Sequence, residues 1–179
     1  ILLLFVKEQQ YLVLVDEFVA KRGMASALQW NIHSWGAFET DGERAFWTER
    51  GNSTLYGHVM HNRAGFFSLA EGWDPPPMRG KDSAQWLQQY HLRFTPNGIE
   101  VPKRNLGVVL CWDHAGWSKP AVETHLHGDT EVAQVGDDLV LVNGGTGISY
   151  RGHVSDAVVW MLIGGQKYAV CDEGLIRQP

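Results

Sequence analysis

The stretch AVVWMLI, residues 157–163, indicates the fold of this chain more directly than the segments around it. Side chains of a β-strand alternate between two faces, and here every position on both faces is apolar. Such a strand is expected in the interior of a sheet, with packed layers above and below it. The segment therefore predicts stacked sheets, because a single open sheet would leave one apolar face in water.

The rest of the chain repeats this strand-like character. In LGVVLCW, residues 106–112, one face carries Leu106, Val108, Leu110 and Trp112, and the other carries Gly107, Val109 and Cys111. Further strand-like runs occupy residues 1–6, 11–20, 26–35, 43–49, 54–61, 65–70, 87–95, 130–135, 139–142 and 167–171. Turn residues separate many of them, and helical periodicity is almost absent. The pattern predicts an all-β fold, an antiparallel multi-stranded β-sandwich with little helix beyond one turn near Ser83.

Length and composition fit a single β-sandwich domain over residues 1–179. The chain is 44% hydrophobic and 20% charged, which excludes a disordered protein. Two cysteines, Cys111 and Cys171, are too few for a disulfide scaffold or a cysteine-built zinc fold. The sequence leaves open whether they pair. A net charge of −5 gives no indication of nucleic-acid or anionic-membrane binding.

Two segments bear on how the chain is organised. Residues 1–6 are apolar, too short to cross a bilayer, and lack the basic leader of a signal peptide, so we expect a strand of a longer protein. The segment WDPPPMRGK, residues 73–81, contains three consecutive prolines that cannot donate hydrogen bonds to a sheet. It predicts a long surface loop, and the strand patterns on both sides argue against a domain boundary there.

Asp16 and His33 form the first candidate metal site. Asp16 points to the same face of its strand as the apolar residues Leu12, Leu14 and Phe18. Because burying an unpaired carboxylate is costly, we expect Asp16 to lie at a solvent-exposed end of the strand or to pair with a cationic group. His33 ends the segment LQWNIH, on the polar face of a second strand. A hairpin joining the two strands would bring together a carboxylate and an imidazole, a normal zinc donor pair. Two ordinary polar strand residues or a direct Asp–His hydrogen bond are the alternatives, since two ligands do not close a site.

A second candidate lies in the segment HLHGDTE, which begins at His125. On a strand, His125 and His127 share one face, and Glu131 follows after a short turn, so three donors could converge. The spacing resembles part of the first metal motif of the cupins, although the flanking glycines are misplaced and no second motif follows. A solvated histidine pair in a turn-rich region is the plainer interpretation.

The other candidate residues carry weaker signals. His58 and His61 would face opposite sides of a strand, and the remaining histidines are isolated. No nucleophile elbow, P-loop or dinucleotide-binding motif is present. Exposed tryptophans could stack on sugar rings, although tryptophans in a β domain more often belong to the core; the candidates are Trp73, Trp86, Trp112 and Trp117.

The segments FVK at residue 5, YLVLVDEFVA at residue 11 and LQWNIHS at residue 28 together resemble one known family. They are similar to the heparinase II/III-like polysaccharide lyases, in which a strand ending in Val-Asp-Arg/Glu precedes a strand ending in Trp-x-x-His. The later order, a Pro-rich loop and then a QYHLR strand, is similar as well. Glu17 departs from the pattern, because arginine is common at that position.

The resemblance implies a fold and an activity. Family members place an N-terminal α/α toroid before a large antiparallel sandwich and cleave acidic polysaccharides by β-elimination. Asp16 and His33 match two of three ligands of a structural zinc, and the third ligand and the catalytic tyrosine would lie upstream of Ile1. Binding of a polyanion would need a local basic cluster, for which Arg79, Lys81, Arg93, Lys103 and Arg104 are the nearest candidates.

We therefore expect the C-terminal sandwich portion of a periplasmic or secreted lyase that acts on a heparan sulfate- or alginate-like polymer. The portion itself is expected to be non-catalytic, with acidic polysaccharide and the missing toroid as partners and no nucleic acid or membrane. The rival interpretation is a non-catalytic carbohydrate-binding or scaffold domain. A cupin-like metalloenzyme comes third.

Overall fold

The computed structural model describes residues 1–19, 29–60, 65–72, 88–97, 103–171 and 174–178, and these residues form an all-β structure. All pairs of neighbouring strands run antiparallel, which confirms the predicted fold class. No helix occurs in the part of the chain that is described, so none there has the length and apolar character to cross a membrane. The helical turn expected near Ser83 lies outside the described residues.

A six-stranded sheet, here called the central sheet, has the order β1-β2-β9-β6-β5-β4. Its strands are β1 (Leu2–Val6), β2 (Tyr11–Val19), β9 (Lys103–Asp113), β6 (Ser53–Val59), β5 (Ala45–Arg50) and β4 (Phe38–Asp41). The long strand β9 joins the two halves, because it pairs with β2 on one side and with β6 on the other.

A second six-stranded sheet, the C-terminal sheet, has the order β10-β11-β12-β15-β16-β17. Its strands are β10 (Val122–His127), β11 (Thr130–Val135), β12 (Asp138–Asn143), β15 (Val159–Ile163), β16 (Gln166–Cys171) and β17 (Gly174–Gln178). A two-stranded hairpin, β13 (Ile148–Tyr150) and β14 (His153–Ser155), is inserted between β12 and β15. The third sheet, the three-stranded sheet, has the order β3-β8-β7, with β3 (Trp30–Ser34), β8 (Tyr90–Pro96) and β7 (Gly65–Glu71).

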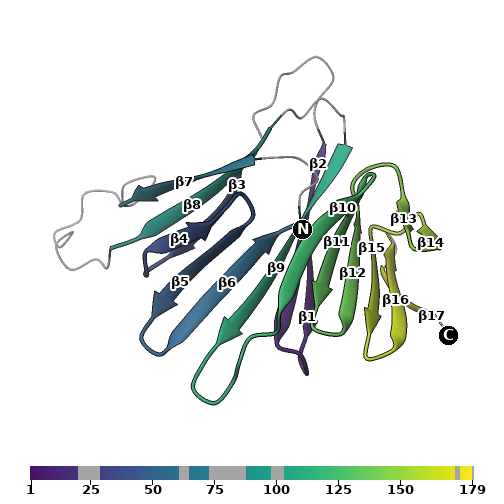
Figure 1. Ribbon diagram of the computed structural model, residues 1–179. Coiled ribbons are helices and arrows are strands. Elements are labelled where there is room, and N and C mark those ends of the chain that lie inside the picture. Colours follow the sequence, from purple (N-terminus) through teal and green to yellow (C-terminus); the bar gives the residue numbers. More distant parts are fainter. Residues whose placement is uncertain (20–28, 61–64, 73–87, 98–102, 172–173, 179) are drawn as a thin grey trace.

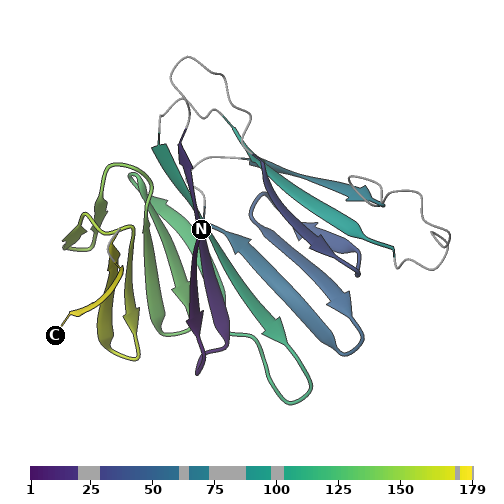
Figure 2. The same ribbon diagram turned by 180° about the vertical axis from the view of Figure 1, so that it is seen from behind.

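The middle strands of the central sheet are buried on both faces, because a different sheet packs against each face. Val13, Val109 and Cys111 face the C-terminal sheet and pack with Val140, Val159 and Met161 in one core cluster. Leu106, Val108 and Phe46 face the other way and pack with Trp30, Leu92 and Phe94 of the three-stranded sheet. Figures 1 and 2 show the three-stranded sheet beside β4 to β6 and the C-terminal sheet beside β1 and β2. The prediction of stacked sheets is confirmed.

The strand that carries AVVWMLI is interior, as predicted. β15 lies between β12 and β16, and Val159 and Met161 point into the core shared with the central sheet. Trp160 points the other way, into a third cluster with Ile148 and Tyr150 of the β13–β14 hairpin. The hairpin therefore supplies the second covering layer that this strand needs. The sequence patterns did not reveal β13 and β14, because each strand has only three residues.

Candidate functional site

Asp16 lies near the end of β2, one residue beyond the part of β2 that pairs with β1. It pairs with Leu106 of β9 and is half-buried. Asp16 points to the same face of β2 as Leu12, Leu14 and Phe18, which pack against the core shared with the three-stranded sheet. The carboxylate therefore sits on the apolar face at a solvent-accessible strand end, one of the two placements expected for it.

His33 lies on β3, opposite His91 of β8. The two imidazole rings meet edge to face, with centroids 4.3 Å apart. His33 is exposed, whereas His91 is only 2% exposed and its Nε2 hydrogen-bonds the Gly72 carbonyl. Ile32 packs into the core, so alternation directs His33 to the outer face of the three-stranded sheet.

The predicted hairpin between the strands of Asp16 and His33 is wrong. β2 lies between β1 and β9 in the central sheet, whereas β3 pairs with β8 in another sheet. The apolar residues Trp30 and Ile32 require β3 to cover the second core, which separates it from β2. Asp16 thus faces the three-stranded sheet from one side, and His33 points away on the other side. The two residues therefore lie on strands of different sheets, and zinc binding by them stays a prediction.

The segment from His125 to Glu131 forms the β10–β11 hairpin. His125 pairs with Val132 and His127 pairs with Thr130, so both imidazoles share one exposed face of β10. Glu131 pairs with Leu126 and projects to the other face, between the two six-stranded sheets. There it is 1% exposed, and its Oε2 accepts a hydrogen bond of 2.9 Å from the Gly107 amide. The three donors do not converge, which supports the plainer interpretation.

No group of three or more histidine, cysteine, aspartate or glutamate side chains is arranged to hold a metal ion within the described ranges. The sequence patterns did not identify two side chains whose pKa is shifted by burial, the half-buried His58 and the buried Cys111. Burial and, to a lesser degree, Lys119 lower the pKa of His58 to about 4. Burial raises the pKa of the Cys111 thiol to about 11, so it is a poor nucleophile at neutral pH. Cys111 and Cys171 are both free, which resolves the question of their pairing.

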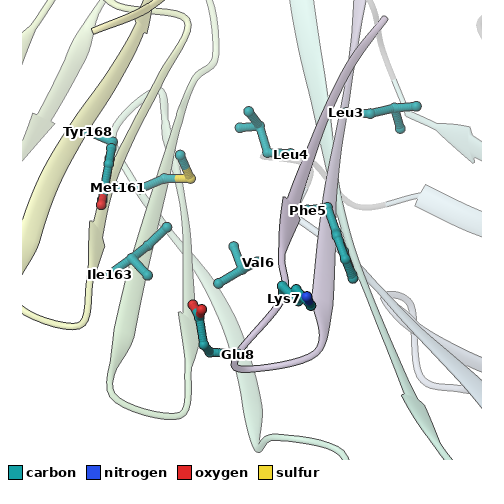
Figure 3. A pocket seen from close by; sticks show the side chains of 9 residues that line it. All are labelled: Leu3, Leu4, Phe5, Val6, Lys7, Glu8, Met161, Ile163 and Tyr168. Atoms are coloured by element: carbon teal, nitrogen blue, oxygen red, sulfur yellow. The ribbon is translucent and has the colours of Figure 1, made fainter. Parts of the chain in front are cut away.

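An apolar groove lies between β1 and the strands β15 and β16. Figure 3 shows Leu4 and Val6 on one side and Met161, Ile163 and Tyr168 on the other. The groove has a volume of about 380 Å³, and Lys7 and Glu8 lie where β1 turns into β2. Its lining is apolar apart from Lys7, Glu8 and the Tyr168 hydroxyl. The groove fits an apolar ligand better than a catalytic centre.

Two tryptophans of the described chain are more than half exposed. Trp35 follows β3 and is 52% exposed, with the Arg50 guanidinium 4.4 Å from its ring centroid. Trp117 is 54% exposed in the turn after β9, where it bridges to His114. Trp112 is half-buried and stacks on Phe5 at 6.0 Å. Trp73 and Trp86 lie outside the described residues.

The five basic residues predicted to form a cluster are only partly described. Arg93 lies on β8, at a position between Asn31 of β3 and Ser68 of β7. The backbone of Lys103 and Arg104 begins β9 in the central sheet, opposite Val19 and Phe18. Arg79 and Lys81 lie outside the described residues. The described members are thus divided between two sheets.

No protein-family model matches the chain, and no curated protein matches it.

Proposed function

We propose that this chain is the β-sandwich portion of a polysaccharide lyase that cleaves a uronate-containing polymer by β-elimination. The observation that carries the proposal is the pair of motifs Val15-Asp16-Glu17 and Trp30-Asn-Ile-His33. These motifs lie on the successive strands β2 and β3. The stacked antiparallel sheets support it as well, since the resemblance implies that architecture.

In the proposed reaction, this portion and the rest of the protein have different roles. In β-elimination the uronate carboxylate is neutralised, a base removes the C5 proton, and an acid protonates the departing O4. In this proposal an N-terminal α/α toroid of the same periplasmic or secreted protein supplies the base. The β-sandwich supplies a packed support, and basic residues such as Arg93 contribute to contacts with the acidic polymer.

Zinc belongs to the proposal as a structural cofactor suggested by the family resemblance. Asp16 and His33 lie on strands of different sheets, and no step of the proposed reaction depends on a zinc ion. Zinc supplied to the folded protein is therefore expected to leave the reaction itself unchanged.

The proposal is tested by measuring the absorbance of the unsaturated uronate ends that β-elimination creates. The natural protein that contains this chain should release such ends from heparan sulfate or alginate, whereas residues 1–179 alone should release none. Lack of turnover by the natural protein on a panel of uronate polymers would contradict the proposal. Turnover by residues 1–179 would mean that the base is among them, with Tyr90 and His91 the first to substitute.

A non-catalytic carbohydrate-binding domain is the second candidate, favoured by the exposure of Trp117. Aromatic faces at the surface can stack on sugar rings. Under this alternative, residues 1–179 should bind a polysaccharide without cleaving it, and Trp117→Ala should weaken binding. Trp35→Ala serves as the comparison, because Arg50 already lies over the Trp35 ring.

A further inference from the structure

The proposed function gives His125 and His127 no role, although their placement on one strand brings two imidazoles close together. They lie on β10, an edge strand of the C-terminal sheet, and both are exposed. Their pairing with Val132 and Thr130 of β11 fixes the register, so both imidazoles project from the same face. Leu126, between them, projects from the other face, where it opposes Glu131.

Tyr150 of the β13–β14 hairpin lies against both imidazoles. Its ring centroid is 5.7 Å from that of His125 and 5.5 Å from that of His127. Tyr150 itself is only 5% exposed and belongs to the core cluster beneath the hairpin. A fixed aromatic ring thus contacts two exposed imidazoles and restricts their rotamers. Each imidazole therefore loses less conformational entropy when it binds a ligand.

We propose that His125 and His127 form a two-imidazole chelating site for a borderline divalent transition metal ion, such as Cu²⁺, Ni²⁺ or Zn²⁺. Alternate residues of a strand have Cα atoms about 6.6 Å apart, a span that two imidazole side chains can close around one ion. Metal–nitrogen bonds are about 2.1 Å long, and imidazole suits these three metals.

Because Glu131 is buried, the site has two protein ligands and not three. That carboxylate faces the central sheet and accepts the Gly107 amide, so it does not complete the coordination. Two protein ligands leave the remaining positions to water or to an added ligand, as in open metal sites. Affinities should follow the general order of N-donor sites, with Cu²⁺ bound more tightly than Ni²⁺ or Zn²⁺.

Isothermal titration of residues 1–179 with CuCl₂ or NiCl₂, near neutral pH in a non-coordinating buffer, tests the site. His125→Ala and His127→Ala should each weaken metal binding by about tenfold or more, because each removes one of two ligands. Both side chains are exposed, so circular dichroism should show that the variants keep the β fold.

Two matched control variants test whether the loss of metal affinity is specific to His125 and His127. His114→Ala removes an exposed histidine that hydrogen-bonds Ser53, and His33→Ala removes the residue predicted for the other zinc site. Both should leave the affinity unchanged. Electron paramagnetic resonance of bound Cu²⁺ should show two nitrogen ligands in the wild type and one in each β10 variant. Wild-type affinity in His125→Ala or His127→Ala, or an equal loss in His33→Ala, would overturn the proposal.

Discussion

Gly57 of β6 shows how closely the second core is packed at the level of single residues. A Cβ atom added to Gly57 would lie 2.0 Å from the nearest ring carbon of Phe46, which is 1% exposed. The ring cannot move freely, because it also contacts Trp30, Phe38 and Phe67. Glycine is needed here for close approach and not for its backbone freedom.

Gly57→Ala should therefore destabilise the protein by about 1–3 kcal/mol through overpacking. Urea unfolding followed by tryptophan fluorescence measures the loss. Gly51, in the β5–β6 turn, has open space around the same added atom but a φ of 60°. Gly51→Asn, which tolerates that φ, should cost less than Gly57→Ala. An equal cost for the two changes would contradict the packing argument.

His58 is the second residue whose behaviour follows from burial. Its Nε2 is buried and has no hydrogen-bond partner among the described residues. Burial, with the positive charge of Lys119, lowers its pKa to about 4. The unfolded chain therefore takes up a proton at His58 between about pH 6.5 and pH 4, whereas the folded chain does not.

The unfolding free energy should fall as the pH drops through this window. His58 should account for about 2 kcal/mol of that decrease, after allowance for its partial exposure. His58→Phe should remove that share, because the aromatic volume stays and the titrating group is lost. Urea unfolding at several pH values between 4 and 7 measures the difference in slope. Parallel pH profiles for the wild type and His58→Phe would refute the argument.

At the scale of the element, β1 is an edge strand with two different faces. Leu3 and Phe5 are 59% and 60% exposed, whereas Leu4 and Val6 face the C-terminal sheet and line the groove in Figure 3. Neither proline nor charge interrupts this edge between Leu2 and Val6. An apolar edge strand of this kind promotes pairing with other chains.

Leu3→Lys should lower self-association of residues 1–179 in sedimentation velocity, with a change in stability within about 0.5 kcal/mol. Leu4→Lys is the matched control, because it places a charge on the face that packs against the first core. That variant should be destabilised by about 1–2 kcal/mol, because Leu4 is half-buried and its apolar contacts with the first core are lost. Unchanged self-association in Leu3→Lys would show that β1 is not the contact.

At the scale of the whole molecule, a buried polar link joins the two six-stranded sheets. The Tyr11 hydroxyl of β2 donates a hydrogen bond of 3.1 Å to Oδ2 of Asp138, at the start of β12. The other carboxylate oxygen accepts the Gly164 amide at 3.0 Å. Burial and the Asp138 charge raise the pKa of Tyr11, so the hydroxyl stays protonated in the folded protein.

Tyr11→Phe should cost about 1.5–3 kcal/mol in urea unfolding, the range for a hydrogen bond to a charged group. Because the folded pKa is raised, wild-type stability should also decline above about pH 10, where tyrosine ionises in the unfolded chain. Tyr11→Phe should lack that part of the decline. Tyr168→Phe removes a hydroxyl that bonds Gln166 at the surface, and its cost should stay within about 0.5 kcal/mol. A comparable loss in both variants would contradict a structural role for the link.

The sequence by itself determined the fold class and much of the strand pattern. A segment that is apolar on both faces, such as residues 157–163, must be covered on both sides, and the local sequence alone shows this requirement. β15 lies in the interior as predicted, and β9 also has a different core on each face. Short strands such as β13 escaped notice, because three residues do not establish a periodicity.

Only the tertiary structure decided which strands became neighbours. Asp16 and His33 are 17 positions apart in the sequence, yet β2 pairs with β9, about ninety residues further along, and β3 pairs with β8. Pairing depends on which apolar faces can be buried together across the whole chain, and no local pattern contains that information. The same reason separates Glu131 from His125 and His127: one hairpin register directs the carboxylate into the core and leaves the imidazoles at the surface.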